Sequence, residues 1–212
     1  MAQIIKFPVQ ASKCGYKRVK NRVKTLEQPG QLYLRLDSSA EILRFSPEQS
    51  CFEHALLLDE RGDARAADLY REAIQTGDCA ADAYCNLGII ESQKGDTTTA
   101  FNCFTTCLQH DPRHAEAHYN LANLYFELND LRLAQVHYEL AGEIAPAFAN
   151  VHFNLALVHA LNADFLAAAQ ALTRYQQLVP ANEARIADEL LENLRRSLAI
   201  TPPPNHAKGS KK

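Results

Sequence analysis

The amino-acid sequence predicts an all-α protein built from repeated helix pairs, and three observations lead to that prediction. An asparagine interrupts an otherwise apolar helix face at Asn86, Asn120 and Asn154, with a constant spacing of 34 residues. Alanines recur with the same spacing at 66, 100, 134 and 168. Two apolar patterns of helical period fall within each period. A fixed period of this length with two helices in it is typical of an α-solenoid.

The period divides the chain into four units, one further helix and two flanking segments. The units are 47–80, 81–114, 115–148 and 149–182, and they are followed by a helix over 183–200. Residues 1–46 do not follow the repeat and are expected to form a flexible basic arm, and 201–212 a disordered tail.

A short break separates the two helices of each unit. The breaks are Gly62-Asp63, Gly95-Asp96, Asn129-Asp130 and Ala163-Asp164. Gly and Asn suit the left-handed C-terminal cap of one helix, and Asp suits the N-cap of the next. Each break therefore predicts the end of a first helix and the start of a second.

The helix over 183–200 is expected to cover the open apolar end of the solenoid. Its apolar face is predicted to consist of Ile186, Leu190, Leu191 and Leu194, with charges on the other side. A last helix with a polar outer face is what a repeat array needs for solubility.

The coordinated positions of one unit carry a family resemblance. They are His118, Leu121, Ala122, Tyr125, Ala134, Tyr138, Ala141 and Pro146. In period, helix layout and signature, residues 47–182 resemble the tetratricopeptide repeat family. The departures are Glu53-His54 in place of Leu-small, and Glu91 and His159 where an aromatic residue is usual.

The resemblance implies a right-handed superhelix, a concave groove lined by the first helix of each unit, and a non-enzymatic scaffold or adaptor that binds a peptide segment there. The implied groove residues lie near Cys51, Phe52 and Ala55 in the first unit. In the later units they are Asp82, Cys85, Asn86, Ile89, Glu116, Tyr119, Asn120, Asn123, Phe126, Asn150, Phe153, Asn154 and Leu157. The three repeated asparagines would form a ladder that donates to and accepts from a peptide main chain. The alternative is that each one bonds a neighbouring helix.

The charges at these positions indicate the kind of peptide. Asp82 and Glu116 are acidic, and no base stands among the groove positions of the second and third units. A basic or neutral peptide is therefore expected, and a clamp for a C-terminal carboxylate is not.

Enzyme, metal and membrane functions find little support. Pro112 prevents His110, His114 and His118 from sharing one helix, and Cys103 and Cys107 are expected to be packed thiols. We expect no catalytic site, no cofactor and no metal. No apolar run is long enough to span a membrane. The N-terminus lacks the apolar run of a signal peptide, so a cytoplasmic location is expected.

Charge is distributed unevenly along the chain. Residues 1–24 hold seven bases and no acid, whereas 25–200 hold 12 bases and 25 acids, a net charge of −13. The candidate contacts in the arm are Lys13, Lys17, Arg18, Lys20, Arg22 and Lys24. Nucleic acid, the acidic solenoid itself or solvent alone could face them.

A short stretch of the arm suggests an alternative function. The stretch that contains Gln31, Leu32, Leu34 and Leu36 resembles the short peptides that bind the bacterial sliding clamp. The alternative is thus a nucleic-acid- or clamp-associated regulator. Docking of these leucines against the first repeat helix also explains the pattern, and it is the explanation that we favour for this stretch.

Overall fold

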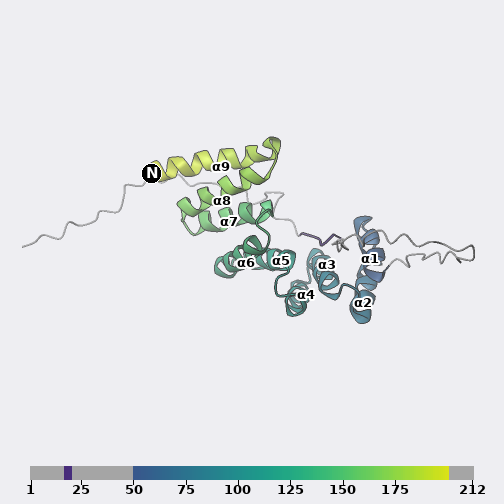
Figure 1. Cartoon of the computed structure of the whole chain (residues 1–212). Helices are drawn as coiled ribbons and strands as arrows, with labels where there is room; N and C mark the ends of the chain where they lie inside the picture. The colour runs from purple at the N-terminus through teal and green to yellow at the C-terminus, as the bar shows by residue number, and fades with distance from the viewer. Residues whose placement is uncertain (1–16, 21–49, 201–212) are drawn as a thin grey trace, which may run out of the picture. The chain divides into compact units, whose positions relative to one another are not determined.

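The computed structural model describes residues 17–20 and 50–200, and in these residues the regular secondary structure is entirely α-helical. The helices are α1 (Cys51–Glu60), α2 (Ala66–Thr76), α3 (Ala80–Gln93), α4 (Thr97–His110), α5 (Ala115–Glu127), α6 (Leu131–Ile144), α7 (Ala149–Leu161), α8 (Phe165–Leu178) and α9 (Ala181–Ile200) (Figure 1). Consecutive helices pack against each other within two compact units. The predicted all-α arrangement of helix pairs followed by one more helix is confirmed.

The N-terminal unit contains Arg18–Lys20 and α1 to α4, and the C-terminal unit contains Lys17 and α5 to α9. One core cluster of the N-terminal unit brings residues of α1, α2 and α3 and Cys103 of α4 together with Phe52 and Tyr70, whose ring centroids lie 5.9 Å apart. Gly88 takes the small-residue position of α3 because a Cβ there would lie 2.7 Å from the ring of Phe104. Close packing of the helix pair therefore depends on a residue without a side chain.

The breaks between helices have the predicted cap geometry. Gly62, Gly95, Asn129 and Ala163 all adopt the left-handed conformation, with φ of 70°, 85°, 60° and 60°. Asp96, Asp130 and Asp164 each accept a hydrogen bond from the backbone N–H three residues later. Asp63 differs, since it accepts from the N–H and side chain of Arg65 before α2 begins.

Glu91 shows how one departure from the repeat signature is accommodated. This carboxylate is almost fully buried, at 7 % exposure, where an aromatic side chain is usual. Arg71 and Lys94 lie 2.9 and 3.1 Å from its Oε1 atom. A buried charge is tolerated when it is paired, so two bases replace the packing that an aromatic ring would provide.

The C-terminal unit ends in α9, which packs on α8. Leu190, Leu191 and Leu194 are buried with Ala187 in one core cluster. Ile186 is 43 % exposed, so its predicted place on the buried face is wrong. Ala187 takes that place, one residue later along the helix. Helix α9 and the other helices of the described chain are not long and apolar enough to cross a membrane.

Candidate functional site

The repeated asparagines lie at the same turn of α3, α5 and α7 and are buried. Two of them bond the main chain of residues 17–20, which precede the repeats. An asparagine inside a helix costs about 0.5 kcal/mol relative to alanine. The hydrogen bonds that each buried amide makes offset that cost, because a buried amide without partners would be unfavourable.

In the N-terminal unit, Asn86 holds both main-chain groups of Val19. The Val19 N–H donates to Asn86 Oδ1 at 2.8 Å, and Asn86 Nδ2 donates to the Val19 carbonyl oxygen at 3.1 Å. Val19 is 1 % exposed. Arg18–Lys20, purple in Figure 1, therefore run beside α3 as a segment bonded through its backbone.

In the C-terminal unit, Asn120 makes the same pair of bonds to Lys17. The Lys17 N–H donates to Asn120 Oδ1 at 2.7 Å, and Asn120 Nδ2 donates to the Lys17 carbonyl oxygen at 2.9 Å. The Lys17 ammonium lies 5.6 Å from the centroid of the Phe148 ring, a cation–π distance. A cavity of about 360 Å³ adjoins Lys17, Glu116 and Phe148.

Asn154 has bonds of a different kind. Its Nδ2 atom lies 3.2 Å from the hydroxyl oxygens of Tyr119 and Tyr138 and 3.1 Å from Asn123 Oδ1. The Tyr138 hydroxyl donates to the same Asn123 oxygen at 2.5 Å. Asn154 thus links α5, α6 and α7, as the alternative interpretation of the asparagines expects for a neighbouring-helix bond.

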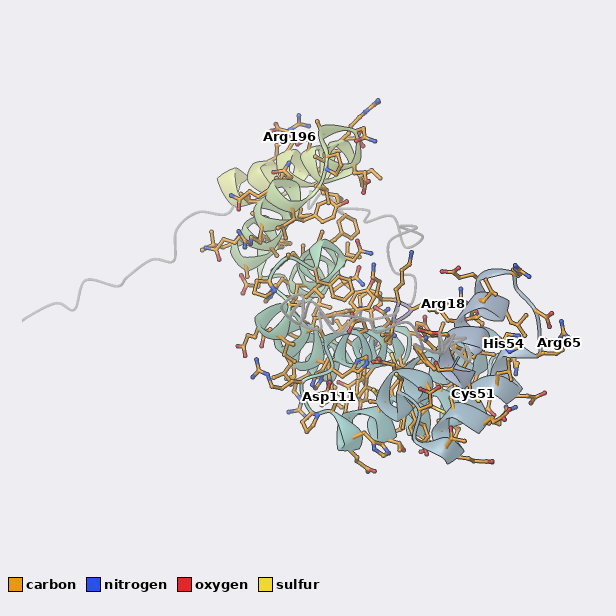
Figure 2. All side chains as sticks on the ribbon, turned by 45° about the vertical axis from the view of Figure 1, so that its right-hand side comes forward. Arg18, Cys51, His54, Arg65, Asp111 and Arg196 are labelled. Carbon is orange, nitrogen blue, oxygen red and sulfur yellow. The ribbon has the colours of Figure 1, made fainter. Side chains whose placement is uncertain are left out.

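Asp59, which the sequence interpretation missed, faces Arg18, the basic residue next to Val19. Its Oδ2 atom lies 2.7 Å from Arg18 Nε, at an angle poor for a hydrogen bond, so the contact is an ion pair (Arg18 is labelled in Figure 2). The Tyr70 hydroxyl donates to the same oxygen at 3.2 Å. Burial raises the pKa of Asp59 above its ordinary value, although Arg18 and Tyr70 both favour the carboxylate.

The other predicted groove residues fall into two groups. Asp82, Glu116, Phe126 and Asn150 are partly exposed, whereas Cys85, Ile89, Tyr119, Asn123, Phe153 and Leu157 are buried. Tyr119 packs on Tyr138 and Phe148, and Phe153 packs edge-on against Tyr175. The large apolar side chains at the predicted groove positions therefore contribute to the helical core.

Several predicted arm contacts lie outside the described residues. They are Lys13, Arg22, Lys24, Gln31, Leu32, Leu34 and Leu36. Among the arm residues that the structure describes, Lys17 and Lys20 have exposed side chains and Arg18 is partly buried. The clamp-like stretch and its docking alternative stay predictions.

The described residues contain no cluster of His, Cys, Asp or Glu suited to a metal ion. His110 ends α4 and stacks on Tyr84, and His114 is the N-cap of α5, where it accepts from the Ala117 N–H. Cys103 and Cys107 are buried in α4, as the packed-thiol interpretation predicted. Burial raises the pKa of the Cys103 thiol to about 11, which disfavours a reactive thiolate.

Comparison with known proteins gives matches to one family. A family model described as tetratricopeptide repeat matches residues 92–156. Tetratricopeptide repeat protein 8 of Mus musculus is 40% identical over 79 residues, which cover 37% of this chain and 15% of that protein. The Homo sapiens protein of the same name is 37% identical over 79 residues, with the same coverage. The chain thus spans only a small part of the length of these relatives.

Solved structures agree in fold. The first tetratricopeptide repeat domain of Spaghetti (RPAP3), bound to the HSP90 peptide SRMEEVD, has a TM-score of 0.52 and 21% identity, and the match covers 56% of this chain and 93% of that one. A tetratricopeptide repeat protein from Parabacteroides merdae has a TM-score of 0.58 and 19% identity, covering 70% of this chain and 60% of that one.

A third structure is the type III secretion translocator chaperone SycD of Yersinia enterocolitica. It has a TM-score of 0.53 and 14% identity, and the match covers 57% of this chain and 87% of that one. At these identities the solved structures support only the fold. The family model and the curated relatives support the similarity in sequence. Together with the paired helices, the matches show that the chain has the tetratricopeptide repeat fold and that residues 92–156 match the tetratricopeptide repeat family model.

Proposed function

We propose that this protein is a non-enzymatic adaptor that binds an extended peptide through its main chain. Asn86 holds such a backbone in the N-terminal unit, and Asn120 is its counterpart in the C-terminal unit. The observation that carries the proposal is the pair of bonds from Asn86 to the N–H and C=O of Val19. Both bonds are made to groups that every residue except proline possesses. The contact therefore selects an extended backbone and is tolerant of side chains.

The preferred ligand is basic or neutral. In the N-terminal unit, Asp59 forms an ion pair with Arg18. In the C-terminal unit, Glu116 lines the cavity beside Lys17. The peptide on the RPAP3 domain, SRMEEVD, is acidic. A carboxylate next to Asp59 would be repelled, so this chain is expected to bind ligands of the opposite charge. A cytoplasmic location, inferred from the sequence, belongs to the same proposal.

An array of immobilised peptides with basic, neutral and acidic sequences tests this function on the full chain. Wild-type protein should bind basic and neutral peptides over acidic ones. The double variant Asn86→Ala/Asn120→Ala should lose binding of all of them, because the main-chain contacts are gone. Asn102→Ala/Asn182→Ala, on exposed helix positions, is the matched control and should bind like the wild type. Equal binding by the two double variants would contradict the proposal.

Amide hydrogen exchange gives a local readout of the same contacts. Asn86→Ala should speed exchange at the Val19 amide, and Asn120→Ala should speed exchange at the Lys17 amide. Each change should be confined to its own residue, because the two asparagines bond different residues. If neither amide responds, the backbone is held by something other than these side chains.

A further inference from the structure

Two residues at equivalent positions of consecutive repeats converge on Arg18. Asp59 stands in the last turn of α1, and Gln93 is the last residue of α3. Arg18 Nε lies 2.7 Å from Asp59 Oδ2, and Arg18 Nη2 donates to Gln93 Oε1 at 3.5 Å. Two consecutive repeats therefore contact the Arg18 guanidinium group, the first through the carboxylate of Asp59 and the second through the side-chain amide of Gln93.

The carboxylate of Asp59 is enclosed by the fold. Its side chain is 5% exposed, against 35% for Arg18. A buried carboxylate without a positive partner is unfavourable. An exposed carboxylate would pair with any basic side chain nearby. The enclosed carboxylate of Asp59 has a fixed position, so it distinguishes basic side chains by their geometry.

The side-chain contact and the main-chain contact are parts of one network. The Tyr70 hydroxyl donates to Asp59 and accepts from Asn86 Nδ2 at 3.2 Å. Asn86 in turn bonds Val19. Tyr70 therefore fixes the position of the Asp59 carboxylate relative to the Asn86 amide. Because Asp59 contacts Arg18 and Asn86 contacts Val19, the subsite recognises these two adjacent residues together.

We propose that Asp59, Gln93 and Tyr70 form an arginine-specific subsite, and that Arg18–Val19 of this chain is its resident ligand, which a partner segment with an arginine followed by a small apolar residue displaces. The inference rests on the proposed peptide-binding function. Arginine suits the subsite better than lysine, because the planar guanidinium presents several donors in fixed directions and is less strongly hydrated than an ammonium.

Fluorescence anisotropy with labelled peptides tests the proposal on the full chain. The probe is GYKRVKNR, the sequence of residues 15–22, and its control is GYKKVKNR, with lysine in place of arginine. The receptor is wild type or the variant Arg18→Glu/Val19→Pro, which removes the attraction to Asp59 and the N–H that Asn86 binds. The double variant should bind the probe at least about tenfold more tightly than wild type, because an intramolecular competitor is gone.

Arginine selectivity is measured within the double variant. The lysine control should bind about tenfold more weakly than the probe. Addition of Asp59→Asn should reduce that difference to less than about twofold, while Asn86→Ala should weaken both peptides equally. Equal affinity for the two peptides, together with sensitivity to Asn86→Ala, would overturn the arginine subsite and leave the peptide-binding function standing.

A folded double variant that binds neither peptide would overturn both proposals and make Arg18–Val19 a fixed part of the fold. Far-ultraviolet circular dichroism and thermal melting decide whether the variant is folded. If it is not, Arg18→Lys in the full chain replaces it, since this conservative change keeps the positive charge. Apparent affinity for the probe should then rise above that of wild type, and an unchanged affinity would contradict the proposal.

Discussion

Asp59 shows which part of the site the sequence could predict. Asn86 and Asn120 were identified because an amide on an apolar helix face violates a simple pattern at a fixed period. Asp59 violates no pattern, since an acid in the last turn of a helix looks like a solvated residue. The overlooked signal was register: Asp59 stands seven residues, or two helical turns, after the position equivalent to Asn86 and so lies on the same face.

The same limit explains the Asn154 result. Sequence periodicity correctly predicted the helix face on which Asn154 lies. It did not predict the direction in which the side-chain amide hydrogens point. That direction depends on Tyr119 and Tyr138, which lie on two other helices. Only packing across helices brings these hydroxyls to the amide, and one-dimensional spacing does not contain that information.

Ala163 offers a stability prediction at the residue scale. It is exposed, and its φ of 60° is a left-handed conformation that costs an L-residue about 1 kcal/mol. Ala163→Gly should therefore raise the free energy of unfolding by about 0.5–1 kcal/mol, as measured by urea denaturation. Gly95→Ala is the converse control, since a Cβ there meets no neighbouring atom and only backbone strain changes. It should be destabilising by a similar amount, and stabilisation by both changes would refute the argument.

At the scale of the elements, the helix pair α5–α6 contains a partly buried histidine contact. His118 Nδ1 and His137 Nδ1 lie 3.0 Å apart, and the ring of His137 stacks on Tyr125. Burial, with a contribution from His118, lowers the pKa of His137 to about 4 from 6.5. The unfolded chain therefore takes up a proton before the folded chain does, so acidification from pH 6.5 to 4 should remove stability.

Replacement of His137 by glutamine tests this pH dependence. The wild-type free energy of unfolding should fall more steeply between pH 6.5 and 4 than that of His137→Gln, by up to about 1.4 kcal/mol per pH unit. Chemical denaturation at several pH values measures the two slopes. His54→Gln, at an exposed position of α1, is the control and should keep the wild-type slope. Parallel curves for wild type and His137→Gln would show that the histidine pair does not govern this range.

The element boundaries were predictable because caps are local. A left-handed residue followed by Asp is recognisable in the sequence, and Asp96, Asp130 and Asp164 cap their helices as predicted. The face of α9 was predicted less well. Ile186 and Ala187 are adjacent, and hydrophobicity favoured the larger residue. Contact with α8 requires the smaller one, because two helices approach closely only over a small side chain.

At the scale of the whole molecule, the repeat array needs its last helix. Leu194 is fully buried and belongs to the cluster that includes Phe153 and Leu172. Leu194→Ala should lower the free energy of unfolding by about 2–5 kcal/mol, because it leaves a cavity in that cluster. Ile186→Ala, at the exposed position of the same helix, should change it by less than about 1 kcal/mol. Thermal or urea denaturation compares the two, and equal losses would mean that α9 does not cap the core.

The pair of bonds that each asparagine makes, Asn86 to residue 19 in one unit and Asn120 to residue 17 in the other, has a consequence for ligand sequences. In an extended chain, the N–H and C=O of one residue point to the same edge, and those of the next residue point to the opposite edge. Asn86 therefore contacts the backbone at a single residue, and Asn120 does the same within its own unit. Proline is excluded at the contacted residue but is tolerated at the residues beside it. The position of proline therefore constrains the ligand more than its composition does.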